Sequence, residues 1–169
     1  MKKKISYLVF FVLLLAIYRL VPHAPNFTPI IAAAIVGPML LKDRLYGIAI
    51  PIIAMFVSDL IIGFHPYQFV VYSSIILISL FSPLYKNYFR IGLISLTGSV
   101  WFYISTNFAV WLMWDYYPKT FEGLISCYVL AIPFFYNTIL STCLFTVGIL
   151  FLIKFIEVVN RKTFKFSYQ

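Results

Sequence analysis

Long apolar runs, separated by short breaks that carry charge or proline, fill most of this chain. Of its 169 residues, 63% are apolar and 11% are charged, and the mean hydropathy is +0.97. This composition lies outside the range of soluble globular domains and is typical of a chain whose solvent is mainly lipid. Inside a bilayer the backbone must satisfy its own hydrogen bonds, so such runs predict α-helices. We therefore predict an all-α membrane protein that forms a single polytopic domain over residues 1–169.

Six apolar runs are predicted to be transmembrane helices. A span needs about 20 apolar residues, or somewhat fewer where the bilayer is thin. The last run, Gly123 to Ile156, is too long for one span and too short for two, so we expect Pro133 to break it. The predicted spans cover about residues 5–20, 29–41, 45–64, 67–85, 91–114 and 134–156, with a surface helix over about 120–132.

Basic residues fall almost entirely on one side of this six-span layout. Only Arg19 and Lys119 fall on the other side. Because basic loops stay in the cytoplasm, both termini are predicted to be cytoplasmic, in a multi-pass protein of a bacterial cytoplasmic (inner) membrane. The basic residues mark the ends of apolar runs and do not line one face, so no nucleic-acid partner is predicted. The cytoplasmic set is Lys2, Lys3, Lys4, Lys42, Arg44, Lys86, Arg90, Lys154, Arg161, Lys162 and Lys165.

Polar and ionisable residues gather in the opposite, outer half of the predicted bundle. An unpaired charge at membrane depth costs about 2–3 kcal/mol or more, so such a residue indicates a functional site. Asp59 lies roughly 7 Å below the outer end of its predicted helix, and Arg19 is its predicted partner. The candidate substrate-binding residues are Arg19, His23, Asn26, Asp59, His65, Tyr67, Asn107, Trp111, Asp115 and Asn137.

Several of these candidates have a purely structural alternative. Arg19 and Asp59 can clamp the first helix to the third without touching a ligand. Asn107, Trp111 and Asp115 recur at steps of four and are predicted to line one helical face. Asn107 is equally able to bond a neighbouring helix. The sequence leaves the choice between pocket and clamp open.

Aromatic residues and histidines near the outer surface also have simple explanations. Trp114, Tyr116 and Tyr117 are more typical of an interfacial aromatic belt than of a binding wall. His23 and His65 are typical loop or cap residues, and only a distant carboxylate would complete a metal site, so neither a metal ligand nor a cofactor is predicted. P-loop, zinc-protease and nucleophile-elbow motifs are absent from the sequence. An enzyme is therefore not predicted.

Several short motifs carry a family resemblance. In the first half they are Pro25-Asn26-Phe27-Thr28-Pro29-Ile30, Ala32-Ala33-Ala34 with Gly37, Lys42-Asp43-Arg44, and Ile50-Pro51 followed by Met55, Ser58-Asp59 and Gly63. In the second half they are Ser105-Thr106-Asn107-Phe108-Ala109-Val110-Trp111 and Ala131-Ile132-Pro133-Phe134-Phe135-Tyr136-Asn137. From Arg19 to about Thr146 the chain resembles the S components of energy-coupling-factor (ECF) transporters, especially an uncharacterised branch assigned to that clan.

This resemblance implies a six-helix bundle with a substrate pocket open to the outside. It further implies delivery by toppling in the membrane when the chain is bound to a transmembrane coupling protein with ATPase subunits. Many S components carry small residues four apart on the first helix for this docking, whereas here Ala33 and Gly37 lie on the second. These two residues are the candidate docking site.

The sequence thus predicts a membrane-embedded solute-binding or transport subunit with its pocket in the outer half of the bundle. The solute would be a small, anionic or zwitterionic, vitamin-like compound, because outward helix N-termini and Arg19 favour anions. Asp59 and Asn107 would orient its polar atoms, and Trp111 with Tyr67 would cover an apolar or ring-bearing part. The alternatives are an accessory structural subunit of a larger membrane complex and a divalent-metal uptake subunit that uses both histidines and Asp59.

Overall fold

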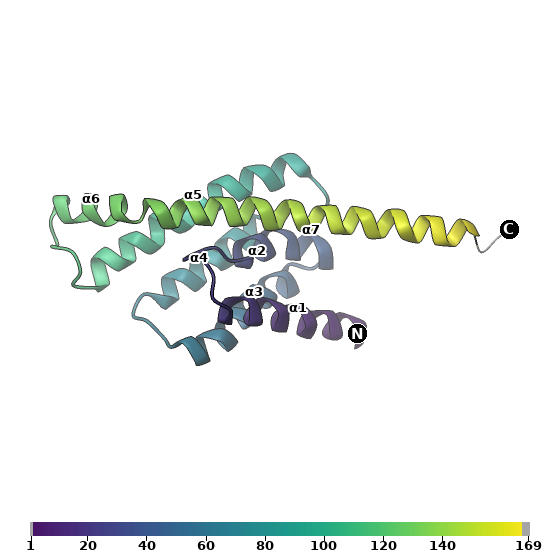
Figure 1. Ribbon diagram of the computed structural model, residues 1–169, viewed down its shortest axis with the longest axis horizontal. Coiled ribbons are helices and arrows are strands. Elements are labelled where there is room, and N and C mark those ends of the chain that lie inside the picture. The colour runs from purple at the N-terminus through teal and green to yellow at the C-terminus, as the bar shows by residue number, and fades with distance from the viewer. Residues whose placement is uncertain (1, 167–169) are drawn as a thin grey trace.

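The computed structural model describes residues 2–166, which form seven helices and no strand (Figure 1). The all-helical prediction is therefore confirmed. Met1 and residues 167–169, which the single-domain prediction includes, lie outside the described residues. The helices are α1 (Lys2–Leu20), α2 (Ile30–Leu41), α3 (Arg44–Ile62), α4 (Gln68–Phe81), α5 (Tyr88–Met113), α6 (Phe121–Leu130) and α7 (Ile132–Phe166).

Helix α2 lies at the centre of the bundle. Nine of its twelve residues are buried, and it contacts α3, α4, α5 and α7. At 1.5 Å per residue it is about 18 Å long, which is shorter than the roughly 30 Å hydrocarbon core of a bilayer. A helix enclosed by its neighbours does not meet lipid along its length, so its short, wholly apolar sequence fits a buried position.

Two glycines bring α2 and α3 into backbone contact. A Cβ atom built on Gly47 would lie 2.4 Å from the backbone nitrogen of Pro38, and one on Gly37 would lie 3.2 Å from the carbonyl oxygen of Gly47. Only the missing side chains allow this approach. Gly37 is therefore buried against its own chain, and Ala33 is half-buried. The predicted docking site is thus covered by α3 at Gly37.

Prolines explain where two helices depart from their predicted bounds. Helix α4 ends at Phe81 instead of residue 85, because Pro83 disfavours a helical conformation at Ser82. The last apolar run breaks at Ala131 instead of Pro133, since Pro133 falls in the first turn of α7, where its missing N–H is not needed. The helix predicted over 120–132 is present, but it continues in line with α7 in Figure 1 instead of turning away.

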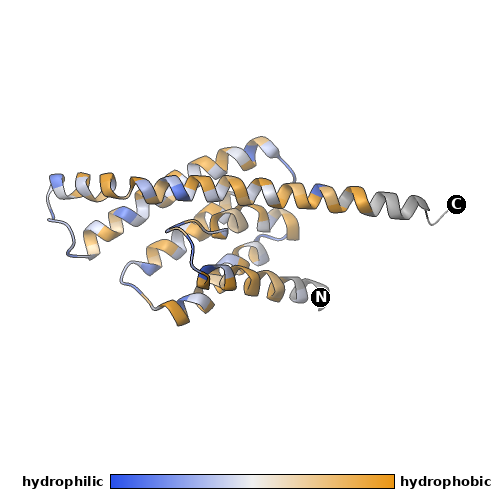
Figure 2. Cartoon of the chain, viewed as in Figure 1, coloured by the Kyte–Doolittle hydropathy of each residue, from blue (hydrophilic) through white to orange (hydrophobic). Residues whose placement is uncertain are grey.

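Three of the described helices could cross a membrane by length and composition. They are Arg44–Ile62, Tyr88–Met113 and Ile132–Ile156. Large apolar side chains such as Phe10, Leu60 and Phe151 are exposed. Figure 2 shows apolar residues along most of the length of the helices, with hydrophilic residues mainly in loops and at helix ends. These features are compatible with a membrane protein.

Candidate functional site

A cavity of ≈ 480 Å³ lies where several helices end and their connecting loops meet. This volume is within the range of small-molecule sites. Residues of all seven described helices and of the loops that precede α2, α4 and α6 line it. Six of the predicted site residues line it, namely Arg19, His23, Asn26, His65, Tyr67 and Asn107.

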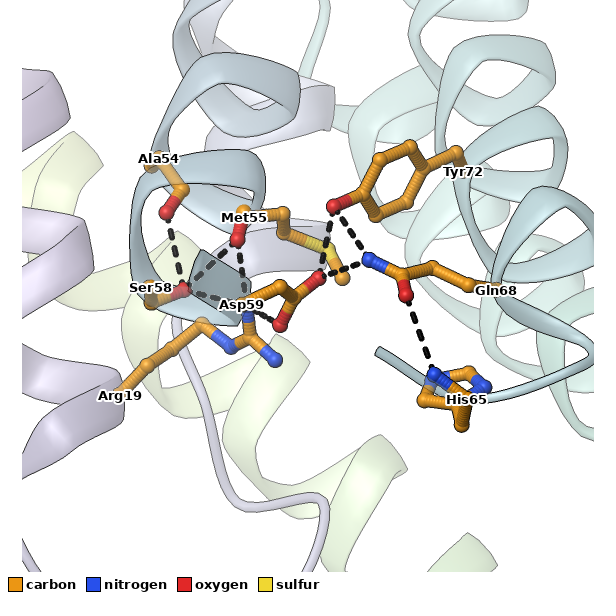
Figure 3. A network of polar contacts seen from close by, with 8 residues as sticks. All are labelled: Arg19, Ala54, Met55, Ser58, Asp59, His65, Gln68 and Tyr72. Atoms are coloured by element: carbon orange, nitrogen blue, oxygen red, sulfur yellow. Dashed lines mark hydrogen bonds and ion pairs between the residues drawn. The ribbon is translucent and has the colours of Figure 1, made fainter. Parts of the chain in front are cut away.

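Arg19, near the end of α1, is tied to α3 by one nitrogen of its guanidinium group. Its Nη1 lies 2.8 Å from Oδ1 of Asp59, so the predicted pairing is confirmed. The same nitrogen donates to the carbonyl oxygen of Met55 at 3.1 Å and to the hydroxyl of Ser58 (Figure 3). Three acceptors on one helix therefore fix the position of this nitrogen.

The Asp59 carboxylate makes all of its contacts inside the protein. Its Oδ2 accepts hydrogen bonds from Nε2 of Gln68 and from the hydroxyl of Tyr72, each at 2.6 Å. Its side chain is 3% exposed, and it does not line the cavity. Asp59 thus joins α1, α3 and α4 and positions Arg19. Gln68 and Tyr72 are not among the predicted site residues, although their spacing of four residues places both on one face of α4.

The other guanidinium nitrogens of Arg19 have no partner among the described residues. All of the side chain's hydrogen bonds and its ion pair use Nη1 (Figure 3). The side chain is 16% exposed and lines the cavity. The Nε–Nη2 edge therefore offers two charged N–H donors to a ligand.

His65 lies in the loop between α3 and α4, beside this network. Its backbone N–H donates to Oε1 of Gln68 at 3.3 Å, and its ring centroid lies 4.0 Å from that of Tyr67. Its Nδ1 is buried without a hydrogen-bond partner among the described residues. Burial lowers the pKa of His65; Asp59 opposes this shift and Arg19 adds to it. The neutral imidazole is thus favoured.

Aromatic side chains from two loops form another part of the cavity wall. Tyr67 and Trp114 meet edge to face with ring centroids 5.3 Å apart, and Trp114 lies 4.7 Å from Tyr116. These three residues and Tyr117 line the cavity. The sequence pattern favoured an interfacial belt for the residues of the second loop, whereas in the structure they face a cavity.

Trp111 and Asp115 do not line the cavity. Helix α5 ends at Met113, so the prediction that Asp115 continues the helical face of Asn107 is wrong. Asp115 is exposed and lies 3.8 Å from Nζ of Lys119. Trp111 donates from Nε1 to the carbonyl oxygen of Pro118 at 2.9 Å, and thereby holds the loop that carries the aromatic residues.

Asn107 and Asn137 differ in their relation to the cavity. Asn107 donates from Nδ2 to the carbonyl oxygen of Tyr103 at 2.8 Å, in its own helix, and still lines the cavity. Its Oδ1 is therefore left to accept a hydrogen bond from a ligand. Asn137 donates to the carbonyl oxygen of Pro25 at 3.0 Å and does not line the cavity. It holds the loop before α2 against α7.

The metal alternative requires several ligand side chains to converge. Over the described part of the chain, no group of three or more His, Cys, Asp and Glu residues could hold a metal ion. Nδ1 of His23 lies 2.6 Å from the carbonyl oxygen of Val21 and is engaged locally. The ligand set of the metal alternative is therefore not brought together among the described residues.

Comparisons with known proteins give one result. A family model described as "Family of unknown function (DUF6580)" matches residues 1–165. No curated protein and no solved structure matches the chain. All of the cavity-lining residues lie within the matched range.

Proposed function

The chain belongs to the DUF6580 family, whose function is unknown, and from its cavity we propose that it is a membrane-embedded solute-binding or transport subunit. Its solute would be a small anionic or zwitterionic compound. The observation that carries this proposal is the Nε–Nη2 edge of Arg19 at a cavity of ≈ 480 Å³. An arginine at membrane depth that served only as a clamp would not need a cavity beside its unbound edge.

The clamp and the binding role are compatible because they use different atoms. Nη1 of Arg19 holds α1 to α3, whereas the remaining nitrogens are left for a solute. Asn107 and the hydroxyl of Thr106, both in the lining, add neutral polar groups, and the rings of Tyr67 and Trp114 add apolar surface. The cavity thus combines apolar and polar lining groups, as solute sites do. The alternative of an accessory structural subunit has no comparable observation in its favour.

The six-span layout remains part of this proposal. The cavity residues lie at the ends of α1, α3 and α5 and at the beginnings of α2 and α4, while Lys42, Arg44, Lys86 and Arg90 lie at the opposite ends. Helix α1 begins, and α7 ends, on the same side of the molecule (Figure 1). This alternation supports six passes with cytoplasmic termini and an outward cavity in a bacterial inner membrane.

If uptake through such a subunit is powered by ATP, the ATPase is another polypeptide, because this sequence contains no P-loop motif. The resemblance to ECF S components favours a transmembrane coupling protein with ATPase subunits. Because Gly37 is buried against Gly47, docking of such a protein would use a surface other than the predicted Ala33–Gly37 pair.

The test is to identify the small molecules that remain with the protein. Wild type and the variant Arg19→Gln are purified gently in nanodiscs, and their extracts are compared by mass spectrometry. We expect a compound that is present with wild type and reduced at least tenfold in the variant. Arg90→Gln is the matched control, because Arg90 is exposed at the opposite end of α5, and it should keep the compound.

A second variant keeps the test decisive if Arg19→Gln does not fold. Asn107→Leu removes an amide whose only described side-chain bond is to its own helix, so the fold should persist while the compound is reduced. The identified compound is then tested for uptake by cells that express the protein with its neighbouring transport subunits. Extracts that contain the same small molecules for wild type and both variants would contradict the proposal.

A further inference from the structure

We propose that the cavity selects a solute with one negative charge on a carboxylate group, attached to a planar ring, and that it discriminates against phosphate dianions. This inference rests on the proposed function, since it names the class of solute for the same cavity. Donor geometry points to an oxyanion, the charge of the site to a monoanion, and the wall composition to a ring.

The charge of the site limits the charge of the solute. Among the described residues that line the cavity, Arg19 is the only Lys or Arg, and none is Asp or Glu. The positive charge of Arg19 is already paired with Asp59 at 2.8 Å. A phosphate monoester carries about −1.5 to −2 charges at pH 7. It would therefore be less well compensated than a carboxylate, and the buried charge of Asp59 would repel it more strongly.

The geometry of Arg19 favours an oxyanion that presents two oxygen atoms side by side. Hydrogen bonds to Met55 and Ser58, together with the ion pair to Asp59, hold Nη1 in place and so fix the plane of the guanidinium group. The Nε–Nη2 edge then presents two N–H groups in one plane (Figure 3). Parallel donors of this kind bind two oxygens of a carboxylate or of a phosphate, so this edge anchors an oxyanion and the charge of the site selects between the two.

The aromatic part of the cavity wall favours a ring. The planes of Tyr67 and Trp114 are inclined by 64° and those of Trp114 and Tyr116 by 58°, so these rings form a corner instead of one flat surface. An aromatic ligand ring can contact one wall by its face and the other by its edge. The volume of ≈ 480 Å³ also exceeds what a simple carboxylate such as acetate would fill.

Three probes with one ring system and different charges test this inference. They are 2-naphthoate, 2-naphthyl phosphate and 2-naphthylmethanol, titrated by calorimetry into the full-length protein in nanodiscs at pH 7.5. We expect naphthoate to bind at least tenfold more tightly than either of the others. In Arg19→Gln the naphthoate affinity should fall to that of the alcohol, whereas Arg90→Gln should behave like wild type.

A change at Asp59 tests the charge argument directly. Asp59→Asn removes the compensating charge with little change in shape, so the ratio of naphthoate affinity to naphthyl phosphate affinity should fall at least tenfold. The comparison of probes on wild type keeps the inference testable if this variant does not fold. Phosphate binding as tight as naphthoate binding would overturn the charge argument, and equal binding of the alcohol would overturn the anchoring by Arg19.

Failure of the inference is distinguishable from failure of the proposed function. In the first case a probe or a copurified compound binds in the cavity but is not a ring-bearing monoanion. In the second case no probe binds wild type, and its extracts contain no small molecule that Arg19→Gln loses. Both outcomes overturn the selectivity proposed here, but only the second removes the solute site itself.

Discussion

Arg19 and Asp59 are expected to be strongly coupled in stability. Their ion pair spans 2.8 Å, the Asp59 side chain is 3% exposed, and its second oxygen accepts two further hydrogen bonds. Removing one partner of a buried pair costs about 3–5 kcal/mol, because the other charge is left uncompensated. The 16% exposure of Arg19 allows some hydration of its guanidinium group, so Asp59→Asn should fall near the lower end of this range.

A double-mutant cycle measures the coupling. The free energy of unfolding is determined in detergent micelles for wild type, Arg19→Gln, Asp59→Asn and the double variant, by circular dichroism during titration with a denaturing detergent. The double variant should lose about 1–3 kcal/mol less than the sum of the single losses, as contacting residues do. In the control cycle, exposed Asp115→Asn replaces Asp59→Asn, and the losses should add. Additivity within about 0.5 kcal/mol for Arg19 and Asp59 would refute the reasoning.

Three other perturbations have definite expected outcomes. His65 has a lowered pKa in the folded protein, so the unfolded chain binds more protons, and acidification from pH 7.5 to 5.5 should lower the melting temperature. The variant His65→Gln should show a smaller decrease in melting temperature over this range. An equal decrease in wild type and variant would contradict the assignment to His65. Gly47→Ala places a Cβ 2.4 Å from the nitrogen of Pro38 and should destabilise the fold by about 1–3 kcal/mol or more, whereas the control Gly148→Ala meets no atom within 4 Å and should be neutral or stabilising. A single cysteine at Asp43, in a background without the native cysteines, should resist impermeant thiol reagents added outside; labelling there would overturn the orientation.

The apolar pattern of the sequence predicts most of the helices because lipid and the protein core impose the same requirement. Residues 29–41 and 45–64 were predicted as helices, and α2 and α3 fall within two residues of these bounds. The pattern does not distinguish a helix that meets lipid from one enclosed by other helices. Helix α2 is therefore recognisable as a helix from its sequence, while its central position follows only from tertiary contacts such as that between Gly37 and Gly47.

A site residue was predictable from the sequence where its unpaired charge would carry a large energetic cost. It was not predictable where its role depends on the conformation of a loop. Asp59 at membrane depth requires a partner, and the nearest cation in the predicted layout is the one found. Trp111 and Trp114 are the same residue type and lie close together in the sequence. Helix α5 ends at Met113, however, so Trp111 belongs to the helix and Trp114 to the loop that follows it. The loop turns back because Trp111 donates to the carbonyl oxygen of Pro118 and Lys119 donates to the carbonyl oxygens of Trp111 and Trp114. These contacts place Trp114 in the cavity and have no signature in residue spacing.

Nη1 of Arg19 bonds to α3, whereas Nε and Nη2 are left for a solute. This difference explains how the proposed polar site can exist in so apolar a bundle. An arginine side chain that is free to move loses conformational entropy when it binds a solute, by roughly 0.5–1.5 kcal/mol. Here α3 has already fixed the guanidinium group through Met55, Ser58 and Asp59, so that entropy is lost on folding and not on binding. The negative charge of Asp59 also lowers the electrostatic cost of placing the Nε–Nη2 edge of Arg19 at the cavity. The interactions that hold α1 to α3 therefore also preorganise the proposed anion site.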